Sequence, residues 1–117
     1  MKNLSGYYGE IEAARYLREQ GYRLMAANYQ TRMGEIDIVA KKDNILAVVE
    51  VKSRLDAPYL YSAAEAVDYH KQRRIQLATQ RYLQQTKYDG LVRFDVIEVY
   101  FNEQMEVVKI NHIQNSF

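Results

Sequence analysis

Two acidic residues and a lysine interrupt the most apolar part of the sequence. Asp37 alternates with apolar residues in the run from 35 to 40, and Glu50 and Lys52 lie in a following run that is rich in valine and isoleucine. The turn signal Asp43-Asn44 separates the two runs. Apolar runs of this length on either side of a polar turn predict a β-hairpin that carries all three residues.

The length of the turn fixes which residues face each other across this hairpin. With a two-residue loop, counting outward places Asp37 opposite Glu50 and Glu35 opposite Lys52. Side chains alternate between the faces of a strand, so these four residues are expected on one face. Directly opposed residues have Cβ atoms ~4.5–5.5 Å apart, where like charges destabilise a sheet. Two opposed carboxylates in an apolar hairpin therefore require a cation.

A divalent metal ion is the cation that suits this pair. Hard ions such as Mg²⁺ and Mn²⁺ prefer carboxylate and water oxygens as ligands. Such an ion polarises a phosphoryl oxygen and activates a bound water for attack. Lys52 follows Glu50 by two residues, so its ammonium is expected in the same space, where it would orient the water or stabilise the phosphate. No Gly-rich phosphate loop is present, and no small-molecule cofactor is expected.

A structural interpretation of the same residues stays open. Glu35 and Lys52 would then form a plain cross-strand ion pair, and Asp37 and Glu50 would be solvated. A register slip of one residue would also send the acids to opposite faces.

The whole-chain properties restrict the class of protein. The chain has 117 residues, which predicts one domain over 1–117, and its composition is that of an ordinary globular protein. It has no cysteine, which excludes disulfides and thiolate metal sites. No signal peptide and no apolar run of membrane-spanning length are visible, so a cytoplasmic location is expected. The formal net charge is only +1, so a nucleic-acid-binding surface requires basic residues gathered on one face.

Hydrophobic periodicity predicts an α/β fold with the order α-β-β-β-α-β-β. A helix between the third and fourth strands implies a parallel pair, hence a mixed sheet flanked by helices. The second helix begins either at Ser62, which has capping-box spacing to Glu65, or near Asp68. The expected elements are a helix over 5–20, strands over 22–29, 35–40 and 45–53, a loop over 54–61, a helix ending before Asp89-Gly90, and strands over 91–101 and 105–110.

The motif residues resemble a known group of nucleases. The run from Gly34 to Asp37, followed thirteen residues after Asp37 by Glu50-Val51-Lys52, resembles the PD-(D/E)XK nuclease superfamily. Ile36 stands where the superfamily motif has proline. More closely, the chain looks like the small YraN-like proteins of bacteria, which are related to archaeal Holliday-junction resolvases. Further matching segments are Gly9-Glu10 with Ala13 and Ala14, Gly21-Tyr22, Arg54, Glu65-Ala66-Val67, Lys71, and Arg93-Phe94-Asp95-Val96.

The resemblance implies a restriction-endonuclease-like core with Asp37 and Glu50 as metal ligands and Lys52 as the catalytic lysine. It further implies hydrolysis of DNA, on branched or flapped structures, by a homodimer that uses Mg²⁺ or Mn²⁺. Glu10 would help to hold the metal, as a first-helix glutamate does in the resolvases. Without the resemblance, Glu10 is equally well explained as a first-turn acid favoured by the helix dipole.

Basic residues near these acids form a possible phosphate-binding rim. Lys71 lies one turn before Ile75 on the second helix, Arg74 lies near it, and Arg54 follows the site strand. A solvated helix face, with Lys71 extended over apolar surface, is the competing explanation. Arg93 and Asp95 fall on one face of a strand, where a structural pair is expected.

Two further functions compete with the nuclease interpretation. The near-neutral charge favours a non-catalytic nucleic-acid-binding or adaptor module that keeps the nuclease fold. The acids would instead form a structural ion-pair network if the chain were purely a protein-interaction domain.

Overall fold

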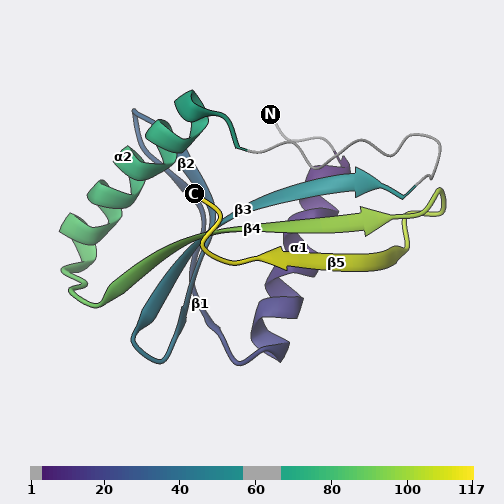
Figure 1. Ribbon diagram of the computed structural model, residues 1–117, viewed down its shortest axis with the longest axis horizontal. Helices are drawn as coiled ribbons and strands as arrows, with labels where there is room; N and C mark the ends of the chain where they lie inside the picture. The colour runs from purple at the N-terminus through teal and green to yellow at the C-terminus, as the bar shows by residue number, and fades with distance from the viewer. Residues whose placement is uncertain (1–3, 57–66) are drawn as a thin grey trace.

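A five-stranded mixed sheet with one helix against each face forms the described part of the protein. The computed structural model describes residues 4–56 and 67–117 (Figure 1). The order of elements is the predicted one. The elements are α1 (Leu4–Glu19), β1 (Arg23–Gln30), β2 (Glu35–Lys42), β3 (Ile45–Leu55), α2 (Tyr69–Thr86), β4 (Leu91–Phe101) and β5 (Val107–Ile113).

The strands follow chain order across the sheet, and a single parallel pair lies at its centre. Neighbouring strands are antiparallel from β1 to β3, β3 and β4 are parallel, and β4 and β5 are antiparallel. The parallel pair exists because the chain crosses over between β3 and β4, through a connection that includes α2. The expectation of an α/β fold with a mixed sheet is therefore confirmed.

The two faces of the sheet have separate hydrophobic cores. On the face covered by α1, Ala13 and Leu17 pack with alternate residues of the strands, among them Val49. On the other face, Ile75 and Tyr82 of α2 belong to a second cluster. The central strands are apolar on both faces because both faces are covered, as is usual around a parallel pair. This arrangement explains the continuous run of apolar residues in β3.

The start of α2 settles one alternative left open by the sequence. Asp68 is the N-cap residue, and its side chain accepts a hydrogen bond of 2.8 Å from the backbone N–H of Lys71. An aspartate in this position satisfies a donor that the first helical turn cannot pair. The helix ends at Lys87, which takes a left-handed conformation and donates to the Leu83 carbonyl. Ser62 lies outside the described residues.

The predicted boundaries are wrong by one to three residues at several strand ends, and among these β2 continues to Lys42 and β5 to Ile113. Arg54 and Leu55, expected in a loop, continue β3 because they stay paired with β4. The last strand begins at Val107 rather than at residue 105. Met105 has φ 62° and lies in the turn, where the side chain of Asn102 accepts hydrogen bonds from backbone N–H groups.

The hairpin of β2 and β3 has the predicted register over its paired residues. Lys42 pairs with Ile45, and the pairing continues outward to Ile38 and Val49. Beyond that pair β2 and β3 no longer pair with each other. Glu35 and Lys52 therefore do not face each other as expected. Glu35 instead pairs with Gln30 of β1, and Lys52 lies beside Glu98 of β4. The two strands therefore separate at the point where the acidic residues begin.

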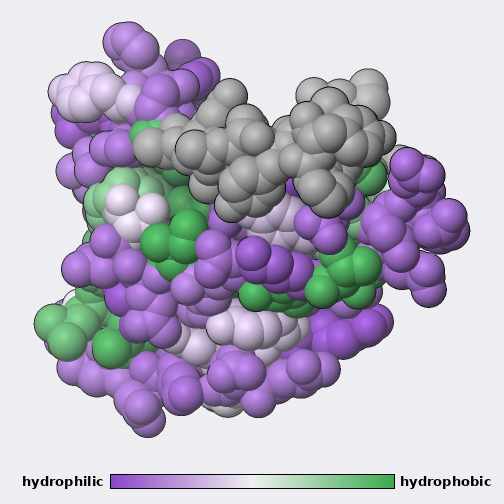
Figure 2. All heavy atoms as spheres, turned by 45° about the vertical axis from the view of Figure 1, so that its right-hand side comes forward, coloured by the Kyte–Doolittle hydropathy of each residue, from purple (hydrophilic) through white to green (hydrophobic). Residues whose placement is uncertain are grey.

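The outer surface is mainly polar on the side that Figure 2 shows, where hydrophobic atoms form separate patches among hydrophilic ones. Within residues 4–56 and 67–117, neither helix combines the length and the apolar character needed to cross a membrane.

A buried ionic cluster joins β4 to β5 and confirms the pair expected between Arg93 and Asp95. The fully buried Asp95 carboxylate accepts hydrogen bonds from the Arg93 guanidinium, with a shortest distance of 2.8 Å, and from the Asn115 backbone N–H at 2.9 Å. The His112 ring lies 2.8 Å from the same carboxylate. Burial opposes ionisation of Asp95, but these partners outweigh it and hold its pKa below the ordinary value.

Replacing Asp95 is expected to destabilise the fold strongly. Asp95→Ala leaves the Arg93 guanidinium partly buried without its counter-ion, a change that costs about 3–5 kcal/mol. Urea unfolding of the wild type and the variant would measure the difference. The matched change Glu19→Ala, at the exposed end of α1, should alter the free energy of unfolding by less than about 0.5 kcal/mol. A loss no larger than that of the control would contradict the structural role of the cluster.

Candidate functional site

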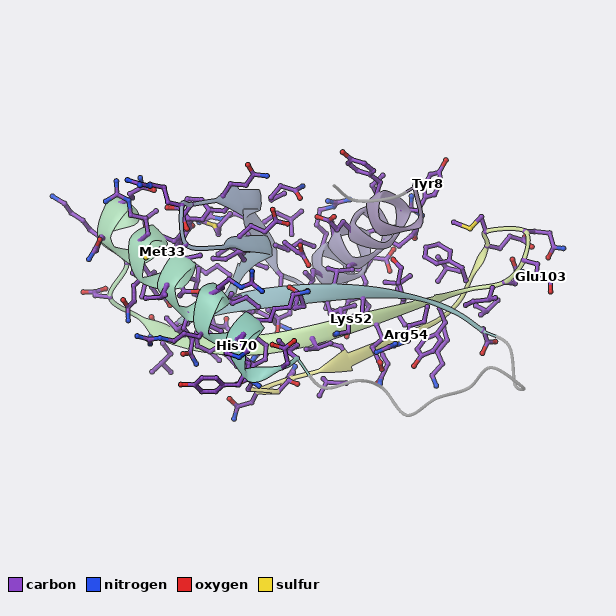
Figure 3. All side chains as sticks on the ribbon, turned by 90° about the horizontal axis from the view of Figure 1, so that it is seen from above. Tyr8, Met33, Lys52, Arg54, His70 and Glu103 are labelled. Atoms are coloured by element: carbon purple, nitrogen blue, oxygen red, sulfur yellow. The ribbon has the colours of Figure 1, made fainter. Side chains whose placement is uncertain are left out.

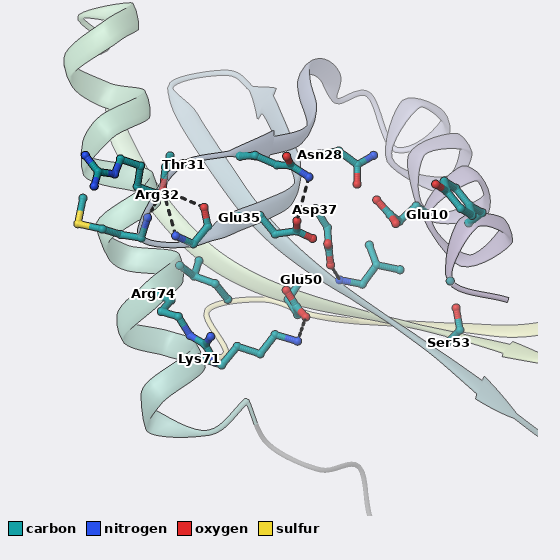
Figure 4. A pocket seen from close by; sticks show the side chains of 17 residues that line it. Glu10, Asn28, Thr31, Arg32, Glu35, Asp37, Glu50, Ser53, Lys71 and Arg74 are labelled. Carbon is teal, nitrogen blue, oxygen red and sulfur yellow. Dashed lines mark hydrogen bonds and ion pairs between the residues drawn. The ribbon is translucent and has the colours of Figure 1, made fainter. Parts of the chain in front are cut away.

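A cleft of about 1130 Å³ opens where β2 and β3 separate. The first half of α1 borders it on one side, and the β1–β2 loop and the start of α2 border it on the other (Figure 4). Its described charged lining residues are four acids, Glu10, Glu35, Asp37 and Glu50, and three bases, Arg32, Lys71 and Arg74. Five of the residues selected from the sequence therefore meet in one cleft.

Asp37 is held in place by the backbone of the neighbouring strand. Its side chain is buried, and Oδ2 accepts a hydrogen bond of 2.9 Å from the backbone N–H of Val51. This N–H lies just beyond the last β2–β3 pair, that of Ile38 with Val49. The carboxylate therefore accepts the hydrogen bond that a backbone carbonyl of a paired strand would otherwise accept. The bond fixes the Asp37 carboxylate beside Glu50, the residue that precedes Val51 in β3.

Glu50 lies between a like charge and an opposite one. Its Oε1 is 2.5 Å from Nζ of Lys71, which reaches the cleft from the first turn of α2. Burial and the charge of Asp37 nevertheless raise the pKa of Glu50 from 4.5 to about 7, against the lowering effect of Lys71. Burial alone would lower the pKa of Lys71, but the hydrogen bond and charge of Glu50 outweigh it and raise that pKa. The Glu50 carboxyl thus exchanges a proton near neutral pH.

The loop from Thr31 to Gly34 positions the start of β2. The Thr31 hydroxyl donates to the Gly34 carbonyl at 2.9 Å and accepts from the backbone N–H groups of Met33 and Gly34, each at 3.1 Å. A Cβ atom on Gly34 would lie 2.6 Å from the Arg74 carbonyl oxygen of α2. Only glycine therefore allows this loop to approach the helix so closely, and the contact brings Arg74 to the rim of the cleft.

Glu10 enters the cleft from the opposite side. It is buried on the same stripe of α1 as Ala13 and Leu17. A Cβ atom on Gly9 would collide with the Ser53 hydroxyl of β3, so the glycine permits close packing of α1 on the sheet. Figure 4 shows the side chains of Glu10, Asp37 and Glu50 projecting into the cleft.

The acids fit a magnesium or manganese ion through the chemistry of their oxygen donors. Within residues 4–56 and 67–117, no three carboxylate or imidazole groups gather closely enough to enclose a metal by themselves. Mg²⁺, however, is commonly bound by one or two carboxylates together with waters and substrate phosphates. Asp37 and Glu50 supply such a pair, and burial together with the charge of Asp37 raises the pKa of Glu50, an effect that a bound cation would oppose.

Two of the basic or catalytic residues selected from the sequence lie elsewhere. From β3 the cleft is lined by Glu50, Val51 and Ser53, and Lys52 is not among its lining residues. Arg54 Nε donates to the buried Glu98 carboxylate at 2.9 Å and is likewise outside the cleft. Figure 3 labels both side chains along β3. The structure thus brings Lys71, rather than Lys52, against the Glu50 carboxylate.

One basic residue of the cleft was missed by the sequence reasoning. Arg32 lies in the loop before β2 and lines the cleft. The available signal was its place directly before the run from Gly34 to Asp37, because a tight loop that leads into an acidic strand keeps its side chains near that strand. The contact between Lys71 and Glu50 had no comparable local signal, since it joins residues from different elements.

Comparison with known proteins identifies relatives over nearly the full chain. The family described as "Uncharacterised protein family UPF0102" matches residues 9–99. A UPF0102 protein of Alkaliphilus oremlandii is 42% identical over 120 residues, covering 100% of both chains. A UPF0102 protein of Caldanaerobacter subterraneus subsp. tengcongensis is 40% identical over 118 residues, covering 99% of this chain and 96% of the relative. A third, from Caldicellulosiruptor saccharolyticus, is 38% identical over 113 residues, covering 96% and 95%.

The raised pKa of Glu50 predicts that the metal-free protein loses stability as the pH rises. The folded state holds this proton up to about pH 7, whereas the unfolded chain releases it near pH 4.5. The stabilising contribution is therefore complete below pH 4.5 and is lost as the pH rises through 7, a loss of about 3 kcal/mol. Urea unfolding in EDTA across this interval would measure it.

Two substitutions of glutamate by glutamine, which has the same shape and no charge, test this prediction. Glu50→Gln should remove most of the slope between pH 4.5 and 7, whereas Glu35→Gln, an exposed residue of the same cleft, should keep it. An unchanged slope in Glu50→Gln would show that another group controls the pH dependence.

Proposed function

The chain belongs to the UPF0102 family, and from this premise we propose that it is a divalent-metal-dependent nuclease of the PD-(D/E)XK type that hydrolyses DNA phosphodiester bonds. The observation that carries the proposal is the pair of buried carboxylates, Asp37 and Glu50, in an open cleft with a basic rim. Burying two neighbouring carboxylates costs free energy, because burial and mutual repulsion both oppose the ionisation of Glu50. A role in folding alone does not readily explain this cost.

Asp37 and Glu50 would hold Mg²⁺ or Mn²⁺, with Glu10 supporting them from α1. When bound, such an ion neutralises charge on a phosphoryl oxygen and lowers the pKa of a coordinated water. The overall reaction adds water across one P–O bond and leaves a phosphate monoester and a hydroxyl group. The family resemblance supports this assignment, because the positions of the superfamily's acidic motif coincide with the two carboxylates of the cleft.

The basic residues of the cleft would bind and orient the phosphate. Lys71 already contacts Glu50, so its ammonium lies within reach of a phosphate that approaches the acids. Arg74 and Arg32 line the same cleft and would hold neighbouring phosphates through charge-assisted hydrogen bonds. Because Lys52 lies outside the cleft lining, Lys71 is the better candidate for the lysine that stabilises charge on the reacting phosphate.

Incubation with single-stranded, duplex and branched DNA in Mg²⁺ or Mn²⁺ tests the activity. Asp37→Asn and Glu50→Gln should each lower the cleavage rate by about 100-fold or more, because each removes charge that the metal requires. Glu35→Gln, at an exposed position of the same cleft, should change the rate only a few-fold. Cleavage that survives EDTA, or that survives both acidic substitutions, would overturn the proposal.

The two lysines give a separate prediction. Lys71→Gln should lower the cleavage rate by about 100-fold through loss of charge stabilisation at the phosphate, whereas Lys52→Gln should have a much smaller effect. Single-turnover rates with saturating DNA would separate this chemical effect from weaker binding. The reverse order of effects would return the catalytic role to Lys52.

Metal binding can be measured without any substrate. A divalent ion that binds only the folded protein stabilises it by about 2.7 kcal/mol at one hundred times its dissociation constant. Added Mn²⁺ should therefore raise the melting temperature of the wild type and leave that of the Asp37→Asn, Glu50→Gln double variant unchanged. An equal shift in both proteins would place the ion elsewhere.

A second candidate function is non-catalytic nucleic-acid binding by the same fold. The specific observation in its favour is the ion pair of Lys71 and Glu50, which already neutralises one carboxylate. It predicts binding that is independent of metal, weakened by salt and accompanied by no cleavage. Gel shifts in EDTA together with the cleavage assay would distinguish the two functions.

A further inference from the structure

A second groove runs beside the acidic cleft, between the β1–β2 loop and α2. It has a volume of about 810 Å³. Two arginines, Arg32 and Arg81, and four glutamines line it, and none of its described lining residues is acidic. The helix that forms one wall, α2, carries four basic residues and no acidic residue between Tyr69 and Thr86. We call this feature the α2 groove.

The α2 groove continues directly from the acidic cleft. Residues 30–33 line both spaces, so Arg32 lies at their junction. Along α2, Arg74 lines the cleft, and Leu77 and Arg81 line the groove. Their spacings of three and four residues place these side chains on one face of the helix. Arg74 and Arg81 of α2, with Arg32 of the facing loop, thus lead from the acidic cleft along the α2 groove.

The walls of the α2 groove are fixed to each other. The Tyr29 hydroxyl donates to the side chain of Gln85, and its ring packs edge-on against Tyr82 with centroids 5.3 Å apart. At the other end, the close approach of Gly34 to the backbone of Arg74 leaves no room for a side chain. The β1–β2 loop, which carries Arg32, and α2, which carries Arg81, are therefore held to each other at both ends of the groove.

We propose that the α2 groove binds the phosphate backbone of a nucleic-acid strand, on one side of the bond that the acidic cleft would cleave. The proposal rests on the proposed nuclease function for the position of the scissile bond. Arginine and glutamine are suited to this occupant, because both donate hydrogen bonds to phosphate and sugar oxygens. A strand that continues into the cleft meets Arg74 and Lys71, which line it together with the acids.

An acidic peptide is the other anionic polymer that the arginines would attract. It fits less well, because its carboxylates would continue into a cleft that already holds four acidic side chains and offers no proposed role for them. A phosphodiester strand would also be repelled by these acids without metal, but the proposed function places its scissile phosphate there, beside a cation held by the same acids. The continuity of the α2 groove with the proposed catalytic cleft therefore favours nucleic acid.

The test is binding of fluorescently labelled single-stranded DNA, followed by anisotropy in EDTA at several salt concentrations. Arg32→Gln and Arg81→Gln should each weaken binding several-fold and reduce the slope of log K against log salt by about 0.7. Arg73→Gln is the matched control, because Arg73 is an exposed arginine of the same helix that lines neither space. It should leave both quantities unchanged.

The length of the strand provides a second readout. Arg81→Gln should weaken binding of a long strand and leave a phosphorylated dinucleotide, which fills only the cleft, unaffected. Equal losses for Arg81→Gln and Arg73→Gln, or tighter binding of polyglutamate than of DNA, would overturn the assignment. Binding is measured without metal, so the two proposals can fail separately. If Arg32→Gln and Arg81→Gln weaken binding but the wild type does not cleave DNA, only the nuclease function is refuted. If the wild type cleaves DNA but these variants bind it normally, only this inference is refuted.

Discussion

The repulsion between the carboxylates of Asp37 and Glu50 is the constraint around which the rest of the site is arranged. The two residues come from strands that pair as far as Ile38 and Val49 and then separate. At that point Asp37 accepts the Val51 N–H, which holds its carboxylate where a strand partner would otherwise be. The fold thus gives up sheet pairing to place two acids side by side, and burial together with the charge of Asp37 raises the pKa of Glu50.

The surrounding elements can approach these acids closely because of two glycines. Gly9 allows α1 to pack against Ser53 of β3, which brings Glu10 to one side of the cleft. Gly34 allows the β1–β2 loop to contact the backbone of α2 at Arg74, which closes the other side. Neither contact buries much apolar surface at the glycine itself, so their effect is on geometry rather than on the size of the core. Gly9 precedes Glu10 and Gly34 precedes Glu35 in the sequence. The close approach of another element at each glycine explains why no larger residue stands there.

Local rules in the sequence were sufficient for the fold and for the acidic part of the site. A two-residue turn fixes a hairpin register, so the pairing of Lys42 with Ile45 and the approach of Asp37 to Glu50 followed from counting. The positions of the lysines did not follow, because they depend on where β2 leaves β3 and on how α2 returns to the sheet. Strand separation withdraws Lys52 from Glu35, and the cap at Asp68 sets the turn of α2 that delivers Lys71 to Glu50.

The small net charge of the chain conceals a strong separation of charge in space. A formal value of +1 argues against a nucleic-acid-binding surface if charges are evenly distributed. Here the acids Glu10, Asp37 and Glu50 gather in the cleft, while α2 carries four basic residues and no acid. The field that a ligand meets within a Debye length depends on this local distribution rather than on the total. An anionic strand would therefore be attracted along α2 and repelled at the acids, and the proposed metal would link its own binding to that of the strand.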